Sequence, residues 1–286
     1  MRVGLVLEGG AMRGMFTAGV LDILMDNNIK IDGIIGTSAG ALFGPNYYSK
    51  QRGRVIRYNK RFCQDKRYVS MRNLILTGNI ISKKYAFYKM NNELDKFNEK
   101  EFKRNNKGFW AVATNVETGL PEYLKITKPL AEMEKLRASS AIPLVSRMVK
   151  IDNKKYLDGG IGDSIPIEAL MRKDYDKIIV ILTQPINFLK PPLDKKTIRK
   201  IKIRYWRYPR LIEAMKNRYN NYNESLELVK KLEKEHKAFV IRPKEKINIK
   251  LVERNPDVLQ KVYEQGINEA TRVIEDLKNY LKNDRK

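Results

Sequence analysis

Histidine, cysteine and long apolar runs are scarce in this chain of 286 residues, and each scarcity excludes a class of chemistry. The single cysteine, Cys63, can form neither an intramolecular disulfide nor a thiolate metal cage, which excludes a disulfide scaffold and a cysteine zinc site. The single histidine, His236, excludes metal sites built from several histidines. We therefore expect no bound metal and no cofactor, and a reaction that needs a histidine base has only His236 to use.

Apolar runs long enough for a targeting or membrane segment are also missing. The first run, from Val3 to Leu7, ends at Glu8 and is too short for a signal-peptide core or a membrane span. No other stretch approaches about 18 uninterrupted apolar residues. We expect a cytoplasmic protein whose contact with a membrane is peripheral, on the inner face of the cytoplasmic membrane.

Acidic residues are few compared with basic ones. Asp and Glu number 33 against 57 Lys and Arg, which gives a formal net charge of +24, while 42% of the residues are hydrophobic. That apolar fraction is too high for a disordered chain, and the length suits one large domain or two small ones. Residues 190–286 carry 26 basic and 14 acidic side chains, so half of the excess charge lies in the last third of the chain.

Short apolar runs alternate with helical patterns through the first half of the chain. Strands are expected at residues 3–7, 31–35, 109–114, 122–126, 147–151 and 177–182, with helices between them. This alternation predicts a three-layer α/β/α core with a mostly parallel central sheet. After Pro185 the chain becomes strongly charged, so we expect a core at residues 1–185 and, at 186–286, a basic and mainly helical C-terminal extension that packs on it.

A glycine-rich turn follows the first expected strand and precedes a helical pattern. It contains Gly9, Gly10, Ala11, Met12, Arg13 and Gly14. Such a turn directs free backbone N–H groups and the positive end of a helix dipole at one point, where an anion binds well. Two other interpretations stay open. One is a plain tight turn, and the other is a dinucleotide fingerprint with Asp32 as the ribose-binding acid, although Ala11 replaces its middle glycine.

The pattern Gly-x-Ser-x-Gly stands between the second expected strand and a further helical pattern. Its residues are Gly36, Thr37, Ser38, Ala39 and Gly40. In this strand–turn–helix context the pattern is typical of a nucleophile elbow, in which small neighbours let the serine occupy a strained turn with its hydroxyl exposed. We therefore predict that Ser38 is a catalytic nucleophile.

The sequence Asp158-Gly159-Gly160 follows an expected strand and a polar turn at 152–155. An aspartate before two glycines usually marks a turn, but here it matters because a serine nucleophile needs a base. His236 lies in a charged helix end, a context typical of a solvated surface residue. A triad of Ser38, Asp158 and His236 still follows the chain order of the α/β hydrolases, so both a dyad and a triad stay open.

Taken together and in this order, the three motifs resemble the patatin-like phospholipases, specifically their bacterial cytoplasmic branch. That family carries a Gly-Gly-Gly-x-Arg/Lys-Gly oxyanion loop, then Gly-x-Ser-x-Gly, then Asp-Gly-Gly or Asp-Gly-Ala, on an α/β fold. The resemblance covers roughly residues 1–185 and includes the small-residue stretch at 138–143. It departs at Ala11, where the family usually has a third glycine and where a methyl group penalises a positive φ.

The resemblance implies a serine acyl hydrolase that uses a Ser–Asp dyad and no histidine. Ser38 attacks an ester carbonyl while Asp158 takes its proton, and backbone N–H groups of the glycine-rich loop hold the oxyanion. Arg13 meets that charge or a substrate phosphate. The implied substrates are phospholipids or related lipid esters, cleaved in the manner of a phospholipase A or a lysophospholipase. A nucleotide-binding α/β protein and a non-catalytic, membrane-binding relative are the alternatives.

Two basic blocks account for much of the positive charge. Residues 195–210 carry eight basic side chains and no acid, and residues 50–72 carry nine with only Asp65. At about 1 kcal/mol for each basic residue close to an anionic leaflet, half of the first block would hold the protein at a membrane in low salt. A helix that docks on the core with its charged face in solvent explains the pattern equally well. Nucleic-acid binding is disfavoured because no nucleic-acid motif accompanies the charge.

Overall fold

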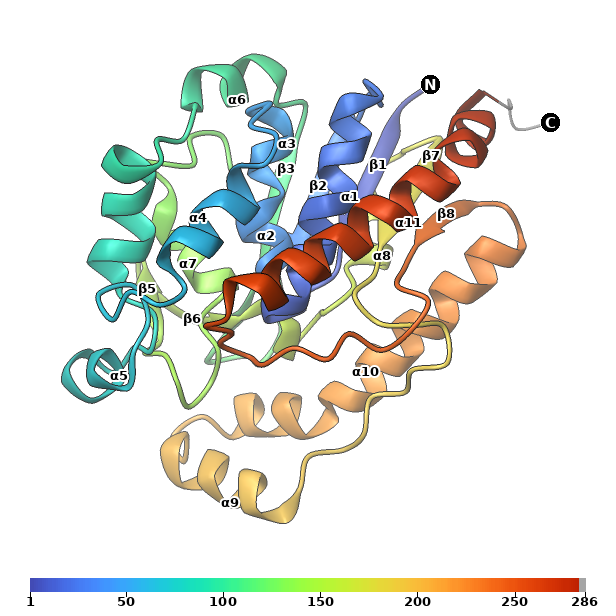
Figure 1. Ribbon diagram of the computed structural model, residues 1–286. Helices are drawn as coiled ribbons and strands as arrows, with labels where there is room; N and C mark the ends of the chain where they lie inside the picture. The colour runs from blue at the N-terminus through green and yellow to red at the C-terminus, as the bar shows by residue number, and fades with distance from the viewer. Residues whose placement is uncertain (283–286) are drawn as a thin grey trace.

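A mixed β-sheet runs through the middle of the protein (Figure 1). The computed structural model describes residues 1–282, and within them the strand order is β5-β6-β3-β2-β1-β7-β8, with β4 paired to β3 outside this path. The strands are β1 (Val3–Leu7), β2 (Gly33–Thr37), β3 (Phe109–Asn115), β4 (Pro121–Lys125), β5 (Val149–Ile151), β6 (Lys154–Asp158), β7 (Lys177–Ile181) and β8 (Ala238–Ile241).

Most of the sheet is parallel, as the alternation of strands and helices predicts. Strands β8, β7, β1, β2 and β3 run parallel, while β4 and β6 pair antiparallel with β3, and β5 pairs antiparallel with β6. The carboxyl ends of the parallel strands meet at one edge of the sheet. The loops that follow β1 and β2 therefore lie next to each other.

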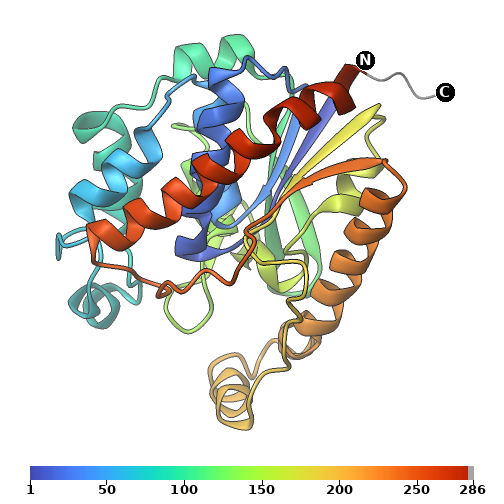
Figure 2. The same cartoon turned by 45° about the vertical axis from the view of Figure 1, so that its right-hand side comes forward.

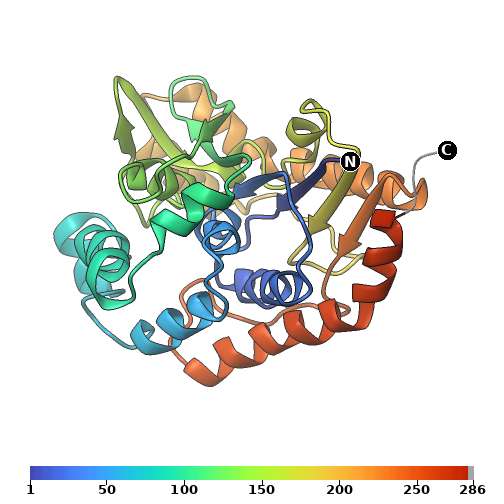
Figure 3. The same ribbon diagram turned by 90° about the horizontal axis from the view of Figure 1, so that it is seen from above.

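Helices cover both faces of the sheet, which confirms the three-layer core (Figure 3). On one face lie α1, α4 and α11, and on the other lie α8 and α10. The helices are α1 (Gly14–Asp26), α2 (Ala39–Phe43), α3 (Pro45–Tyr48), α4 (Arg54–Phe62), α5 (Met71–Thr77), α6 (Glu99–Asn105), α7 (Met133–Ser139), α8 (Ile167–Met171), α9 (Lys195–Arg204), α10 (Pro209–Lys234) and α11 (Pro256–Lys282). Within residues 1–282, no helix has the length and apolar character needed to span a membrane.

Two hydrophobic cores are built from alternate residues of the same strands. Every residue of β1, β2 and β7 is buried, as expected for parallel strands covered on both faces. Leu5 and Leu7 of β1 join the core beneath α1 and α11, whereas Val6 joins the core beneath α10. The alternation of side chains along a strand therefore divides the apolar residues between the two faces.

The C-terminal residues join both the sheet and one helical layer. Strand β8 pairs with β7 in parallel, with Ala238 opposite Ile178. Helix α11 crosses α1 so closely that a Cβ on Gly19 would lie 2.2 Å from the carbonyl oxygen of Tyr263 (Figure 2). The domain boundary at residue 185 stays a prediction, and residues 283–286 of the predicted extension lie outside the described residues.

Two expectations about strand positions are corrected. Strand β2 spans Gly33–Thr37 rather than 31–35, so it ends directly before Ser38. The segment expected to be a polar turn at 152–155 contains the start of β6, which forms a hairpin with β5. Lys154 and Lys155 are exposed in this short hairpin, so β6 begins without the apolar alternation that predicts a strand.

Candidate active site

Ser38 occupies the sharp turn between β2 and α2. Its backbone has φ +53° and ψ −115°, a conformation that L-residues avoid and that is held by the surrounding structure. The flanking glycines are required for space, because a Cβ on Gly36 would lie 2.6 Å from the carbonyl carbon of Gly40, and one on Gly40 would lie 2.6 Å from the oxygen of Leu7. The turn has the geometry of a nucleophile elbow.

Strand pairing brings Asp158 to this turn. β2 ends with Thr37 opposite Val112 of β3, and β6 ends with Asp158 opposite the next β3 residue, Ala113. Because β4 occupies the other edge of β3 over the same residues, β6 continues on the edge where β2 stops. The Ser38 hydroxyl donates to Asp158 Oδ2 at 2.7 Å, and both residues are 6% exposed.

The surroundings of the Asp158 carboxylate suit a proton acceptor. Its second oxygen, Oδ1, accepts a hydrogen bond from the backbone N–H of Gly160 at 2.8 Å. Burial raises the pKa of Asp158, while the hydrogen bond from Ser38, the positive charge of Arg218 and the Gly160 N–H act in the opposite direction. The net rise of the pKa makes this carboxylate a stronger base than an aspartate in water.

The glycine-rich loop lies against Ser38 from the neighbouring strand. A Cβ on Gly9 would lie 3.3 Å from the Cβ of Ser38, so the two loops are in contact. The N–H of Gly9 donates to the carbonyl oxygen of Ser164, whereas within residues 1–282 the N–H groups of Gly10 and Ala11 have no acceptor. Ala11 has φ +47°, the left-handed conformation in which a methyl group is penalised. These two N–H groups are free to donate hydrogen bonds to an additional acceptor.

The other predicted residues surround these groups. Thr37 donates from its hydroxyl to the carbonyl oxygen of Asp163 at 3.0 Å, which ties the end of β2 to the loop after β6. A Cβ on Gly159 would lie 2.1 Å from the carbonyl oxygen of Val112, so this position allows only glycine. Met12 and Ala39 line the adjacent pocket, and Gly14 begins α1. Arg13 turns its Nε toward the Thr183 hydroxyl, at 3.3 Å.

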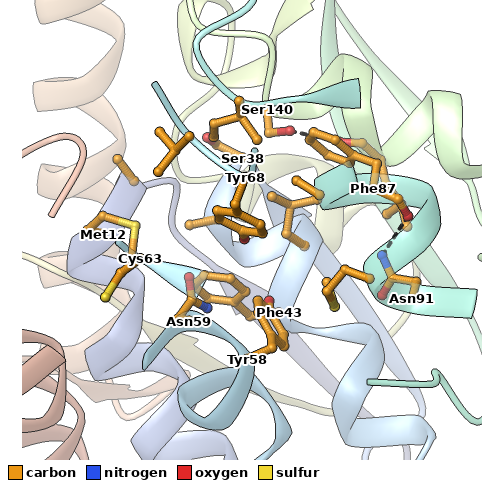
Figure 4. A pocket seen from close by; sticks show the side chains of 18 of the residues that line it. Met12, Ser38, Phe43, Tyr58, Asn59, Cys63, Tyr68, Phe87, Asn91 and Ser140 are labelled. Atoms are coloured by element: carbon orange, nitrogen blue, oxygen red, sulfur yellow. Dashed lines mark hydrogen bonds between the residues drawn. The ribbon is translucent and has the colours of Figure 1, made fainter. Parts of the chain in front are cut away.

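An apolar pocket opens beside Ser38 (Figure 4). Its walls come from α2, α4, the helical stretch 83–94 and α7, with Leu251 and Val252 from the segment between β8 and α11. The side chains that line it include Phe43, Tyr58, Tyr68 and Phe87. Burial raises the pKa of the Cys63 thiol in this wall, so the chain's one thiol stays protonated there. The pocket suits a hydrocarbon chain.

Sequence reasoning missed the residues that position the site. Ser139 is fully buried and its hydroxyl accepts the backbone N–H of Ser38 at 2.9 Å. The small-residue stretch at 138–143 was the signal that could have found it. Glu8 is also fully buried, and its carboxylate accepts hydrogen bonds from the Tyr222 hydroxyl and the Thr183 N–H. Arg218 and Tyr222 lie on α10, and no local motif marks them.

The geometry excludes two alternative interpretations, the triad with His236 and the dinucleotide site with Asp32. His236 is exposed beyond the end of α10, just before β8 begins opposite the amino end of β7, whereas Ser38 lies at the carboxyl edge of the sheet. The triad with His236 is therefore excluded. Asp32 precedes β2 and accepts a hydrogen bond from the N–H of Val3 at the start of β1, at the opposite end of that strand from the glycine-rich loop. It cannot act as the ribose-binding acid of a dinucleotide site.

The chain is similar to several known proteins. A family described as patatin-like phospholipase matches residues 5–171, and a domain of unknown function, DUF6363, matches residues 208–282. The uncharacterized protein YjjU of Escherichia coli strain K12 is 31% identical over 195 residues, which are 67% of this chain and 54% of YjjU. The probable lipid hydrolase 463L of Invertebrate iridescent virus 6 is 27% identical over 63% of this chain and 69% of its own length.

Two further proteins are more distantly similar to this chain. The lysophospholipase NTE1 of Scheffersomyces stipitis is 26% identical over 63% of this chain, which matches only 11% of that protein. The solved structure of VipD from Legionella pneumophila superposes with a TM-score of 0.47 and 13% identity, covering 96% of this chain and 67% of VipD. This chain spans about half the length of YjjU and a small part of NTE1.

The family match covers more than half of the chain and contains all three motifs. Within it lie the loop that begins at Gly9, the elbow with Ser38, and Asp158. These are the segments that the fold brings together around one buried hydroxyl. The chain belongs to the patatin-like phospholipase family.

Proposed function

We propose that this protein is a serine acyl hydrolase that cleaves carboxylic esters of lipids through a Ser38–Asp158 dyad. The observation that carries the proposal is the 2.7 Å hydrogen bond between the Ser38 hydroxyl and the Asp158 carboxylate, at a strained elbow beside an apolar pocket. A buried serine that donates to a carboxylate of raised pKa is an activated nucleophile.

In the first half of the reaction, Ser38 Oγ attacks the ester carbonyl and Asp158 accepts the hydroxyl proton. The negative charge that develops on the carbonyl oxygen is held by the N–H groups of Gly10 and Ala11, each worth on the order of 10²–10³ in rate. Asp158 then gives the proton to the leaving alcohol. In the second half, water attacks the acyl-Ser38 ester, Asp158 takes a proton from the water, and the fatty acid leaves as Ser38 regains its proton.

The pocket supports a lipid as the substrate. Its lining is dominated by aliphatic and aromatic side chains, which favour an acyl chain over a short polar acid. The lysophospholipase and lipid-hydrolase relatives agree with this substrate class. We therefore place the activity with phospholipases A and lysophospholipases.

Labelling with a fluorophosphonate probe tests the proposal at the level of the nucleophile. The full chain should react, and peptide mass spectrometry should place the adduct on Ser38, while the Ser38→Ala variant stays unlabelled. Labelling at another residue, or none in the folded wild type, would contradict an activated Ser38. It would favour the remaining alternative, a non-catalytic membrane-binding relative.

We further propose that the basic segment at 195–210 places the enzyme on an anionic membrane at the cytoplasmic face. Within residues 1–282 none of its cations forms an ion pair, and Ile203 and Trp206 in the same segment are 67% and 68% exposed. Helix α5, with exposed Met71, Ile75 and Leu76, lies at the lower left of the molecule in Figure 1, and α9 lies at the bottom. Basic and apolar side chains together favour the surface of an anionic bilayer.

In the other basic block, residues 50–72, several arginines form ion pairs within the fold. Arg54 is 2% exposed and, like Arg57, pairs with Asp95. Arg52 pairs with Asp26, and Arg67 pairs with Asp65.

A liposome sedimentation series distinguishes the two blocks. Charge-neutral substitutions at 195–210 should abolish binding to vesicles that contain phosphatidylglycerol, and binding that does not depend on anionic lipid would contradict the membrane proposal.

A further inference from the structure

Three cationic side chains gather beside the dyad. Arg13 comes from the glycine-rich loop, Lys190 from the segment after β7, and Arg218 from α10. Burial first, and then the charges of Arg218 and Arg13, lower the pKa of Lys190 to about 8, while Glu8 acts in the opposite direction. The contributions of the two arginines to this pKa mean that Lys190 lies near both of them.

Arg218 lies directly against the loop of the catalytic aspartate. A Cβ on Gly160 would lie 3.0 Å from Asp158 Oδ1 and 3.1 Å from Arg218 Nη2, so the missing side chain leaves room for both groups. The Nε of Arg218 is buried and unpaired. In the described part of the chain, Arg218 forms no hydrogen bond and no ion pair. A buried N–H without an acceptor, such as this Nε, is costly unless a ligand supplies one.

Glu8, the acid whose charge acts on Lys190, is already satisfied by other groups. Glu8 accepts from the Tyr222 hydroxyl and the Thr183 N–H, and none of the three cations pairs with it within residues 1–282. Lys190 instead lies over the ring of Tyr222, with Nζ 4.3 Å from the ring centroid. Within the described residues, Arg13 donates one side-chain hydrogen bond, from its Nε to the Thr183 hydroxyl. The cluster therefore keeps free N–H donors for an additional anion.

The cationic cluster and the apolar pocket lie on different sides of Ser38. The pocket is lined from α4 and from other elements packed with α1, whereas Arg218 and Tyr222 come from α10 on the opposite face of the sheet. None of the three cations lines the pocket. An ester whose acyl chain fills the pocket leaves its alcohol portion outside, and the cations lie on the side of Ser38 opposite the pocket.

We propose that Arg218, with Lys190 and Arg13, binds a phosphate carried by the alcohol portion of the lipid ester, so that α10 selects phosphate-bearing substrates. The inference rests on the proposed ester hydrolysis and extends it to the substrate's polar half. Guanidinium groups match phosphate with two parallel N–H···O bonds, and a phosphate at this position supplies the acceptors that Arg218 lacks. It also assigns a role to part of the C-terminal domain of unknown function.

A direct binding experiment tests the site without using catalysis. Isothermal titration of the full-length Ser38→Ala variant with sn-glycerol 3-phosphate, inorganic phosphate and glycerol should show binding of the first and none of glycerol. Arg218→Gln in that background should weaken binding by about tenfold or more, because a charge-assisted pair is lost. Lys216→Gln removes the same charge from the same helix but from an exposed pair with Glu213, and should have no effect.

Three results would overturn the inference. One is no binding of sn-glycerol 3-phosphate, another is equal binding by the Arg218→Gln variant, and the third is binding of inorganic phosphate alone. The first two mean that the cations only balance the buried charges of Glu8 and Asp158. The third assigns the site to free phosphate rather than to a substrate.

A second arm measures selectivity with the otherwise wild-type enzyme. The readout is the ratio of kcat/KM for 1-octanoylglycerol 3-phosphate to kcat/KM for 1-octanoylglycerol, two esters that differ only in the phosphate. Arg218→Gln should lower this ratio by about tenfold, and Arg218→Lys should restore part of it. Using the ratio removes the influence of Arg218 on Asp158, which affects both substrates alike.

An unchanged ratio would overturn the inference even if both rates fall. Failure of the proposed function looks different, because hydrolysis would then persist in Ser38→Ala or be absent from wild type. The titration with sn-glycerol 3-phosphate still decides the phosphate site in that case.

Discussion

Ser38 Oγ and Asp158 Oδ2 are 2.7 Å apart although the two residues are separated by 120 positions in the sequence. They meet because β2 and β6 end at consecutive residues along one edge of β3. The fixed register of the sheet, rather than a flexible loop, sets this distance. In the mechanism that we propose, catalysis therefore depends on one carboxylate and one hydroxyl that backbone pairing holds together.

Replacing Asp158 should abolish ester hydrolysis, whereas replacing the only histidine should not. Asp158→Asn keeps the shape of the side chain but removes the proton acceptor, so kcat should fall by about 10³-fold. His236→Ala is the matched control, because His236 is exposed and lies at the other end of the sheet. Loss of activity in the His236 variant with retention in the Asp158 variant would contradict the dyad.

The pH dependence of kcat/KM should report the raised pKa of Asp158. The carboxylate must be ionised to accept the proton, so activity falls as pH decreases through a pKa that lies above the usual aspartate range. Because the charge of Arg218 lowers that pKa, Arg218→Gln should move the acidic limb to higher pH, and Arg218→Lys should leave it in place. The measurement uses a neutral ester, and an acidic limb at the ordinary aspartate value would contradict the assignment.

The same pKa shift has a consequence for stability. A folded-state pKa above the unfolded value means that the stability contributed by Asp158 is present at low pH and is lost as pH rises through the folded pKa. Asp158→Asn should therefore melt at a higher temperature than wild type at pH 7, with a difference that shrinks as the pH is lowered. Thermal denaturation across pH measures it, and a destabilised variant at pH 7 would count against a buried, ionised carboxylate.

Ala11→Gly should stabilise the protein. Relief of the left-handed strain at φ +47° raises the free energy of unfolding by about 1–2 kcal/mol. The greater freedom of glycine in the unfolded chain lowers it by about 0.4–1 kcal/mol. A net gain of about 0.5–1 kcal/mol is expected in urea denaturation. Ala86→Gly, in the helical stretch 83–94, is the control and should destabilise, as glycine does in a helix interior.

Ser139→Ala should weaken both the fold and the elbow. The change leaves the backbone N–H of Ser38 buried without its acceptor, at a cost of about 1–3 kcal/mol. Ser225→Ala is the control, because its hydroxyl only bonds back to the carbonyl oxygen of Asn221 on the same helix. Equal stability of the two variants would show that Ser139 does not position Ser38.

The residues predicted from the sequence are those marked by local chemistry. The elbow around Ser38 and the turn at Asp158 need small residues at fixed spacing, and that need is visible in the sequence. The buried run of β1 and the pattern of α1 are equally local. The sequence also indicates strain at Ala11, because the family usually has a glycine there. The structure confirms a positive φ at this residue.

The residues missed act through tertiary contacts. Arg218 and Tyr222 reach the site only because α10 packs on the face of the sheet opposite α1, and nothing in their local sequence distinguishes them from other helix residues. Lys190 looked like one charge among many in a basic region. Strand β8 lies between charged segments and is recognised only by its pairing with β7.

The most direct test of the account is mass spectrometry of the lipid products. Purified wild type is incubated with vesicles of mixed phospholipids and lysophospholipids, and free fatty acids and their alcohol counterparts are quantified against Ser38→Ala. We predict that wild type releases fatty acid and the matching lysolipid or glycerophosphate, and that Ser38→Ala releases none above the no-enzyme control. Equal release by the two proteins, or no release by wild type, would contradict a Ser38-dependent lipid ester hydrolase.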